Sequence, residues 1–325
     1  NVEESLPNLL FYAIETDNNE LKQLVYQSAK QHLNFLMPDG SWDNSWGTRR
    51  DKWTYWGSRT SDGSFPLYTY FSEKDSDFAS AAALNLQLLK ICTHDGLLTG
   101  GPDFEEAGIT TSLHHTFCHT KALAFAIDYK LPLEPKAKIV VPRQQEKGLT
   151  HIPEINVYRL QQGEWTGTLT FNDALYKSEA TPSGGVLSAL YLKDWGMFMV
   201  SSTEVYTRYE RDNMHSKVVV PNFGVLTPQL YAKVDGKLYR HTFDFEAQIK
   251  NLRQADNRLE FDVKGHLCTQ YGVVNDEDIP FEIMYKFRGN DMRMYFRVLE
   301  MRENAEVYYH LPILANQEEE VKSSK

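Results

Sequence analysis

One segment of this 325-residue chain, residues 38–64, combines residue types that could do chemistry on a sugar polymer. Four of the six tryptophans of the chain lie in it: Trp42, Trp46, Trp53 and Trp56. Four basic residues lie within 11 positions: Arg49, Arg50, Lys52 and Arg59. The segment has no helical or strand periodicity, and a loop of this composition is costly to leave in solvent unless it lines a site. Because tryptophan rings stack on sugar faces and guanidinium groups bind carboxylate or sulfate, the segment predicts a surface for an acidic polysaccharide.

Tyr55 lies inside this segment, six residues after Arg49 and four before Arg59. Nearby guanidinium groups favour the phenolate form of a tyrosine, so such a tyrosine can take up or return a proton near neutral pH. Structural roles are the alternatives. The hydroxyl of Tyr55 can serve a hydrogen-bond network, and the arginines can stack on the tryptophans of a loop packed between helix ends.

A second group of candidate residues is the histidine-rich run from His114 to His119. His115 and His119 are four residues apart, so a helix places them on one face, as in a pair of metal ligands. The sequence offers no third ligand at a fixed offset. Two interpretations remain beside the metal site: His114 or His115 faces a cleft as a proton-transfer or carboxylate-contacting group, or these are ordinary helix-end histidines.

Helices are expected to position both groups. Apolar residues recur at spacings of three and four over 20–36, 77–93 and 112–129, and residues 6–15 predict a shorter helix. The apolar stripe expected over 112–129 consists of Leu113, Phe117, Leu123, Phe125 and Ile127. Loops rich in Gly, Asp and Ser separate these helices. Residues 131–143 contain three prolines and no helical stripe, so the helical part is expected to end there.

The rest of the chain predicts an antiparallel β-sandwich. Short alternating runs with turn signals between them extend from residue 155 to residue 312, among them 155–160, 204–209, 217–220 and 238–249. The fold class is therefore α+β and multidomain. The expected division is 1–132 helical, 133–150 linker, 151–316 β-sandwich, and 317–325 a frayed, charged tail.

The charge and hydropathy of the chain exclude several classes of binding partner. The chain has 34 Lys and Arg, 44 Asp and Glu, and a net charge of −10. Such an acidic chain is a poor candidate for binding nucleic acid or an anionic membrane. No apolar run reaches the roughly 18 residues that a membrane span needs. The three cysteines, Cys92, Cys118 and Cys268, fit neither a disulfide framework nor a zinc ribbon.

Four segments together resemble polysaccharide lyases of the heparinase II/III and alginate-lyase type. They are the start Asn1-Val-Glu-Glu-Ser-Leu-Pro, the turn Pro38-Asp39-Gly40-Ser41, Tyr55 in its Arg/Trp loop, and the helical run HHTFCHTKALA. Those enzymes combine an incomplete (α/α) toroid with antiparallel β-sandwich domains. The resemblance implies a partial toroid over 1–132, completed by an upstream portion of the same protein. Val2 departs from the family pattern, which often has a histidine directly after the matching asparagine.

The chemistry that the resemblance implies is β-elimination in a uronic-acid polymer. The C5 proton is too weakly acidic to leave until the adjacent carboxylate is neutralised, and a base and an acid must then serve C5 and the departing O4. The resemblance implies that Tyr55 is the acid or base and that Asn1 neutralises the carboxylate. It also implies that His114 or His115 lies near the reaction centre. Arg49 or Arg59 would support Tyr55 and the substrate carboxylate. The other residues of the segment would bind substrate: Arg50, Lys52, Trp42, Trp46, Trp53 and Trp56. The implied mechanism requires no cofactor. A structural metal ion in the β half is compatible with the resemblance but is not predicted.

Two other functions are also consistent with the sequence. A glycoside hydrolase on a helical barrel needs two carboxylates across the scissile bond, for which the candidates are Asp43, Asp62, Glu105 and Glu106. A non-catalytic glycan-binding protein would use the tryptophans for stacking alone. Because uronic-acid polymers are met outside the cytoplasm, the expected location is periplasmic or secreted.

Overall fold

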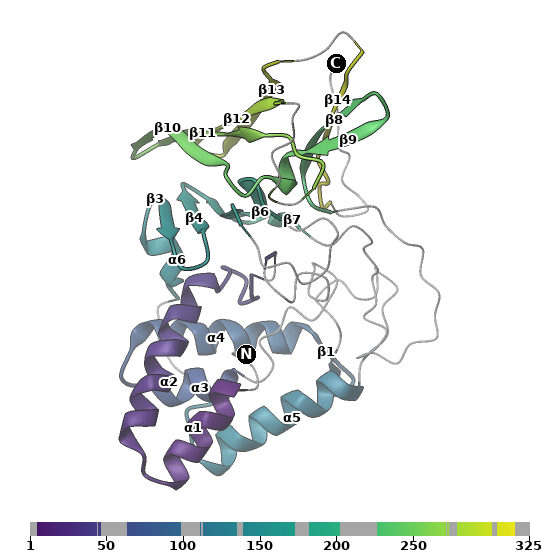
Figure 1. The fold of residues 1–325 in the computed structure, drawn as a ribbon. Helices are drawn as coiled ribbons and strands as arrows, with labels where there is room; N and C mark the ends of the chain where they lie inside the picture. Colours follow the sequence, from purple (N-terminus) through teal and green to yellow (C-terminus); the bar gives the residue numbers. More distant parts are fainter. Residues whose placement is uncertain are drawn as a thin grey trace. The chain divides into compact units, whose positions relative to one another are not determined.

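The structure is a computed structural model that describes residues 5–43, 45–46, 64–98, 111, 113–134, 139–172, 182–201, 226–270, 272, 278–300 and 304–315. These residues form an α+β protein with helices and several antiparallel sheets (Figure 1). The chain divides into two compact units. The helical unit contains the described residues up to Gln145 except Ser45 and Trp46, and the β unit contains those two residues and the described residues from Glu146 onward.

The helical unit contains five longer helices and one short one among the described residues. They are α1 (Ser5–Glu15), α2 (Asn19–His32), α3 (Phe65–Phe71), α4 (Ser76–Ile91), α5 (Leu113–Asp128) and α6 (Pro142–Gln145). A 3-10 turn, η1 (Leu33–Phe35), continues α2, and a hairpin of β1 (Thr93–His94) and β2 (Leu97–Leu98) follows α4. The helices predicted over 6–15, 20–36, 77–93 and 112–129 are confirmed, with residues 33–35 of the second in a 3-10 turn.

Two differences from the expected helices have physical reasons. Helix α3 lies outside the predictions because six of its seven residues are buried, so it has no polar face to reveal a stripe. The stripe predicted for α5 is only partly right. Leu123 packs against the helical core, but Leu113 and Phe117 are 76% and 71% exposed, whereas Ala122 and Ala126 are buried. Small side chains on the buried side let α5 approach its neighbours closely.

Polar contacts fix the ends of α2 and α4 in the helical unit. Asn18 caps α2 by accepting a hydrogen bond from the backbone N–H of Leu21 at 2.9 Å. Asp75 caps α4 in the same way through Asp77. Lys30, in the last turn of α2, binds Asp75 at 2.6 Å and Asp77 at 2.7 Å. One lysine therefore ties the end of α2 to the start of α4.

The β unit contains three antiparallel sheets among the described residues. The first runs in chain order through β3 (Gly148–Ile152), β4 (Val157–Gln162), β5 (Trp165–Thr170), β6 (Val186–Leu192) and β7 (Gly196–Val200). The second runs through β10 (Gln248–Ala255), β11 (Arg258–His266), β12 (Pro280–Arg288) and β13 (Asp291–Val298). The third has the order β14 (Glu306–His310), β8 (Gln229–Val234) and β9 (Lys237–Arg240).

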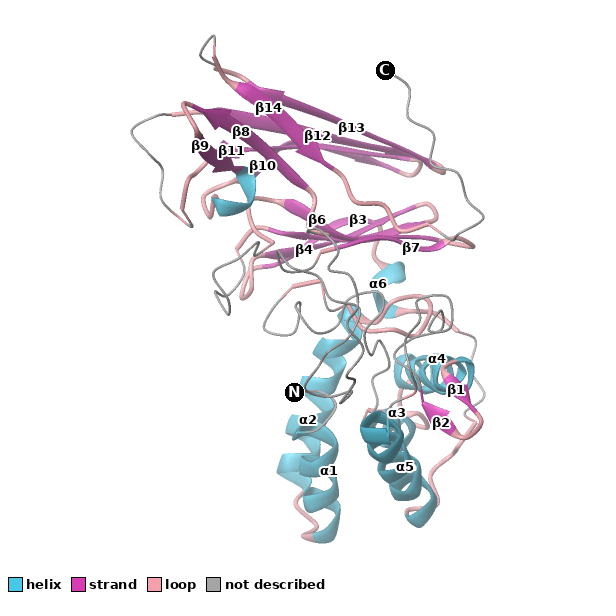
Figure 2. Cartoon of the chain, turned by 90° about the vertical axis from the view of Figure 1, so that its right-hand side faces the viewer, coloured by secondary structure: helices cyan, strands magenta, loops and turns pink. Residues whose placement is uncertain are grey.

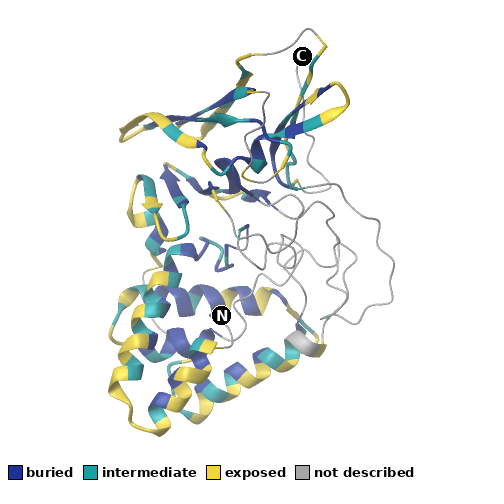
Figure 3. Ribbon diagram, in the orientation of Figure 1, coloured by how far each residue is buried: buried dark blue, intermediate teal, exposed yellow. Residues whose placement is uncertain are grey.

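One hydrophobic core joins the three sheets of the β unit. Leu169 and Leu190 come from the first sheet, Phe261 and Ile283 from the second, and Leu230 from the third. Figure 2 shows the first sheet as one layer and the other two sheets in a second layer. Buried residues run along β4, β5 and β6 of the first sheet and along β11 of the second (Figure 3). Two layers across a shared core are the packing that a β-sandwich requires.

Two strand predictions differ in their bounds. Strand β3 begins at Gly148, inside the segment expected to be linker. The prolines of that segment all precede Gly148, so they do not interrupt the strand. The run 238–249 is split by the 3-10 turn η2 (His241–Phe243) between β9 and β10. The runs 204–209 and 217–220 lie outside the described residues.

His241, in η2, makes the stability of the β unit depend on pH. Its side chain is buried, and its Nδ1 accepts a hydrogen bond from the backbone N–H of Leu230 at 3.0 Å. Burial lowers its pKa from 6.5 to about 4, so the unfolded chain binds this proton more readily than the folded chain does. With respect to this group, the folded β unit is most stable above pH 6.5. Its free energy of unfolding is expected to fall by about 3 kcal/mol as the pH decreases from 6.5 to about 4.

Denaturant unfolding at several pH values checks this expectation. The variant His241→Asn should lose the wild-type decrease in stability between pH 6.5 and 4, whereas His310→Gln, at the end of β14, should keep it. His32 in the helical unit is half-buried and its pKa is also lowered to about 4, so the quantity to compare is the difference between variant and wild type. An equal slope in His241→Asn and wild type would contradict the assignment.

Candidate functional site

Most of the residues predicted to do chemistry lie outside the described residues: Asn1, Arg49, Arg50, Lys52, Trp53, Tyr55, Trp56, Arg59, Asp62, Glu105 and Glu106. His114 and His115 lie in the first turn of α5, as the sequence predicts for a helix, but their side chains are outside the description. Of the Arg/Trp segment, the structure therefore describes Trp42 and Trp46 near its start. It also describes the contacts of residues 38–43, which precede the loop.

The turn Pro38-Asp39-Gly40-Ser41 closes a short hairpin just before the loop. Leu36 and Trp42 form an antiparallel bridge, and the Met37 N–H donates to the Ser41 carbonyl at 2.8 Å. The Gly40 N–H donates back to the Met37 carbonyl at 3.0 Å. The Asp39 carboxylate accepts the Ser41 N–H at 3.0 Å, which is the side-chain bond typical of an Asx turn. This turn fixes the direction in which the chain enters the candidate site.

Gly40 is required at this turn for two reasons. Its φ is +84°, and a Cβ placed on it would lie 2.5 Å from the carbonyl oxygen of Leu84 in α4. We expect Gly40→Ala to reduce the free energy of unfolding by about 2–4 kcal/mol, from backbone strain and the clash together. Gly236→Ala is the matched control, because Gly236 has a φ of +81° and nothing within 4 Å of the added atom.

Denaturant unfolding of both variants separates the two contributions. The control should lose about 1 kcal/mol from backbone strain alone. Equal losses in the two variants would mean that the contact between Gly40 and Leu84 contributes nothing.

A buried ion pair holds Asp43, the residue that follows this turn and Trp42, in the helical unit. Arg143 of α6 contacts the Asp43 carboxylate through Nη1 at 3.2 Å, and both side chains are 0% exposed. The same Nη1 lies 2.9 Å from the sulfur of Met37. Arg143 thus reaches back along the chain to both ends of the turn. Because a buried charge is costly unless it is paired, this contact fixes Asp43 in position.

This ion pair removes Asp43 from the hydrolase carboxylates considered above. A general acid or base must reach the glycosidic bond, whereas the Asp43 side chain is closed to solvent and bound to Arg143. Asp43 is therefore structural. Sequence reasoning missed Arg143, which lay within the expected linker, because an ion pair across so long a stretch of chain leaves no local pattern.

Trp42 and Trp46, predicted to bind sugar, are both half-buried. The ring centroid of Trp42 lies 5.7 Å from that of His32 in α2. Burial lowers the pKa of His32 to about 4, so this ring is neutral near pH 7 and adds no charge beside Trp42. In the β unit, Ser45 binds the hydroxyl of Ser188 in β6 at 3.1 Å, which holds the residue next to Trp46 on the first sheet.

The metal interpretation of the histidine run gains no further ligand. His119 is buried on α5. Within the described ranges, no three His, Cys, Asp or Glu side chains gather as a metal-ion site.

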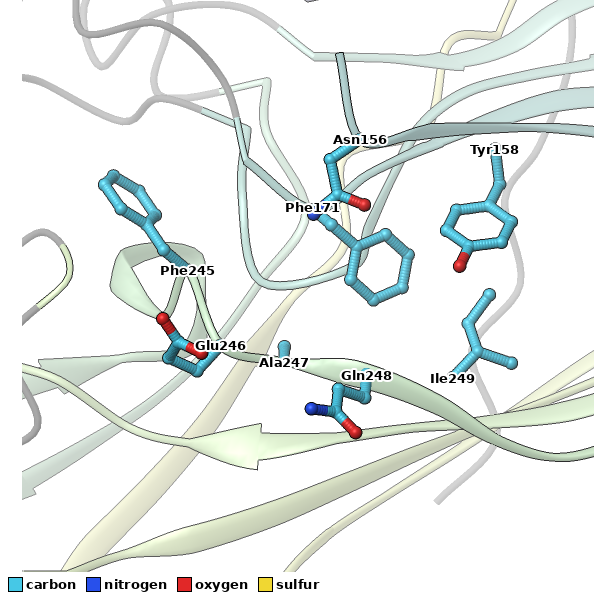
Figure 4. A pocket seen from close by; sticks show the side chains of 8 residues that line it. All are labelled: Asn156, Tyr158, Phe171, Phe245, Glu246, Ala247, Gln248 and Ile249. Carbon is cyan, nitrogen blue, oxygen red and sulfur yellow. The ribbon is translucent and has the colours of Figure 1, made fainter. Parts of the chain in front are cut away.

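A pocket of about 380 Å³ opens in the β unit between β4 and the start of β10 (Figure 4). Asn156, Tyr158, Phe171 and Gln248 line it together with Glu246. Among the described residues, its lining includes a carboxylate but neither Lys nor Arg. Because an acidic polymer needs cations, this pocket does not suit the ligand that the sequence predicts.

Comparison with known proteins covers both halves of the chain. The family model of the ulvan lyase N-terminal domain matches residues 1–145, and that of the ulvan lyase C-terminal domain matches residues 149–325. The chain belongs to the ulvan lyase family. A curated relative named broad-specificity ulvan lyase, from Formosa agariphila, is 39% identical over 256 residues, which are 77% of this chain and 40% of the relative. No solved structure matches the chain.

These matches confirm the predicted resemblance to polysaccharide lyases. The chain spans less than half the length of its ulvan lyase relative. In the parts of the chain that the structure covers, no helix is long and apolar enough to cross a membrane.

Proposed function

We propose that this chain belongs to an enzyme that cleaves ulvan, an acidic polysaccharide containing uronic acid, by β-elimination. The observation that carries this proposal is the match of both halves of the chain to ulvan lyase domains, over 1–145 and 149–325. The relative at 39% identity, named a broad-specificity ulvan lyase, supports the same substrate class.

The proposed mechanism assigns the chemistry to the Arg/Trp loop and the histidine run. Tyr55 takes the C5 proton and returns a proton to the departing O4, while Asn1, His114 or His115, and Arg49 neutralise the uronate carboxylate. The remaining basic and aromatic residues bind the neighbouring sugars: Arg50, Lys52, Arg59, Trp42, Trp46, Trp53 and Trp56. The fixed position of Asp43, twelve residues before Tyr55, supports this assignment because it anchors the chain that enters the loop.

The architecture proposed for this enzyme is a partial (α/α) toroid of the heparinase II/III and alginate-lyase type over 1–132, a linker over 133–150, a β-sandwich over 151–316 and a tail over 317–325. An upstream portion of the same protein completes the toroid. The shared core of the three sheets supports the sandwich. The proposed location is secreted or periplasmic, where the polymer is met, and the chemistry requires no cofactor.

Ultraviolet absorbance of the unsaturated uronate tests the proposal. The full-length protein is incubated with ulvan, alginate, glucuronan, hyaluronan and heparan sulfate in turn. A rise in absorbance with ulvan is expected, because β-elimination leaves a double bond conjugated to the carboxylate. New reducing ends without this absorbance would indicate a hydrolase, and saturable binding without any product would indicate a binding protein.

A further inference from the structure

A basic face covers the outer side of the four-stranded sheet β10–β13. Leu259, Phe261 and Val263 of β11 point into the core, so the residues between them lie on the opposite side of the sheet. Following the strand pairing from there places eight Lys or Arg side chains on this side, two from each strand, against four Asp or Glu side chains. The whole chain has the opposite balance, a net charge of −10.

Two of these carboxylates are each held by two cations. Glu260 is bound by Arg258 and, at 3.2 Å, by Arg288. Glu282 is bound by Lys264 at 2.7 Å and by Arg297. Each group of three therefore keeps one positive charge, and the side chains of Arg288 and Arg297 remain 62% exposed. Asp262 accepts a hydrogen bond from the Asn251 side chain at 2.6 Å.

An aromatic platform lies between these two charged groups. Tyr295 of β13 is 47% exposed, and its pairing partner on the same side is Met284 of β12. The Lys286 ammonium lies 5.1 Å from the centre of the Tyr295 ring. A shallow pocket of about 480 Å³ includes these residues and Arg297 in its lining. The platform thus offers a partly exposed aromatic ring with Lys286 over it and Arg297 in the same pocket.

We propose that this outer face of β10–β13 is a second, non-catalytic binding surface for an acidic polysaccharide chain. Carboxylate or sulfate groups of the polymer contact Lys286, Arg293 and Arg297, and a sugar ring stacks on Tyr295. Cations recur about every 7 Å along a strand and about 5 Å between strands, so several contact one extended chain at once. The choice of ulvan as the polymer rests on the proposed function. The charge complementarity does not.

Such a surface changes the binding of long chains more than of short ones. A polymer held on the sheet is delivered to the enzyme at a high effective concentration, whereas an oligosaccharide too short to span two sites gains nothing. The surface therefore predicts a lower KM for long polymers without any effect on kcat.

Affinity electrophoresis in gels containing ulvan tests the proposal. Both proteins compared carry Tyr55→Phe, so that the polymer stays intact. Adding Lys286→Gln and Arg293→Gln should weaken retention about tenfold, as expected for the loss of two exposed charge contacts. The matched control, Lys233→Gln with Lys237→Gln, removes two exposed charges from β8 and β9 of the same unit and should retain wild-type affinity.

Further arms identify what is recognised. Tyr295→Ala should weaken binding to ulvan but leave binding to polyglutamate unchanged, because only a sugar ring stacks on the tyrosine. Alginate, which carries only carboxylates, and heparan sulfate, which adds sulfates, distinguish the two anionic groups. Equal retention of the Lys286/Arg293 double variant and its control would overturn the proposal. A change in oligomeric state without a change in retention would also overturn it and would make the face a contact between copies.

The readout is binding, so it does not depend on turnover. If the wild-type protein forms no unsaturated product from any polymer but the double variant still loses retention, the proposed function fails and the surface stands. If product forms and retention is unchanged by the double variant, the surface fails and the proposed function stands.

Discussion

Replacing Tyr55 with phenylalanine is expected to reduce the formation of unsaturated product by at least 10²–10⁴-fold, the usual contribution of one general acid or base. The ring is kept, so stacking and packing change little, and only the proton carrier is lost. We expect kcat to fall while KM stays nearly constant, because the hydroxyl acts in the transition state rather than in substrate binding. Initial rates of absorbance change on ulvan measure both parameters.

Two comparisons make this result specific. Tyr12→Phe is the matched control, since Tyr12 lies on α1 with 57% of its surface exposed, and this variant should keep wild-type rates. The thermal unfolding midpoint of Tyr55→Phe should stay close to that of the wild type. A large fall in that midpoint with little change in rate would assign Tyr55 to a structural hydrogen-bond network, and full activity would remove it from the mechanism.

The fold is predictable from the sequence where one side of an element is apolar and the other is polar. Helices α1, α2 and α4 and strands such as β11 and β12 show this in their apolar spacing. Helix α3 shows no such pattern, because nearly its whole circumference is buried. In α5, Leu113, Phe117 and Ile127 are exposed while Ala122 and Ala126 are buried, so hydrophobicity alone places the buried side only in part.

The candidate site was predictable only in its local parts. The Asp–Gly turn at 38–41 can be read from residue types, since an Asx turn and a positive φ favour those two residues. The pair between Asp43 and Arg143 cannot, because it depends on how α6 packs. The basic face of β10–β13 is likewise invisible along the chain, where its cations are scattered among acids, and only the strand register gathers them on one side.

Breaking the pair between Asp43 and Arg143 is expected to have the largest effect on stability. Arg143→Met keeps the length of the side chain but leaves the Asp43 carboxylate buried without its partner, and Asp43→Asn leaves the guanidinium buried in the same way. Each should lower the free energy of unfolding by about 3–5 kcal/mol. Glu134→Gln is the matched control: it breaks the pair with Lys90, whose side chains are 63% and 75% exposed, and should cost less than about 1 kcal/mol.

The double variant Asp43→Asn with Arg143→Met separates the pairing of the charges from their burial. With both charges gone, no uncompensated ion is left inside the helical unit, so much of the lost stability should return. Denaturant unfolding of the four proteins measures the coupling between the two positions. If Arg143→Met costs no more than Glu134→Gln, water reaches the pair and Asp43 is not anchored by it. Because both side chains are 0% exposed, the single variants should also lower the rate of product formation, since the pair anchors the chain that leads to Tyr55.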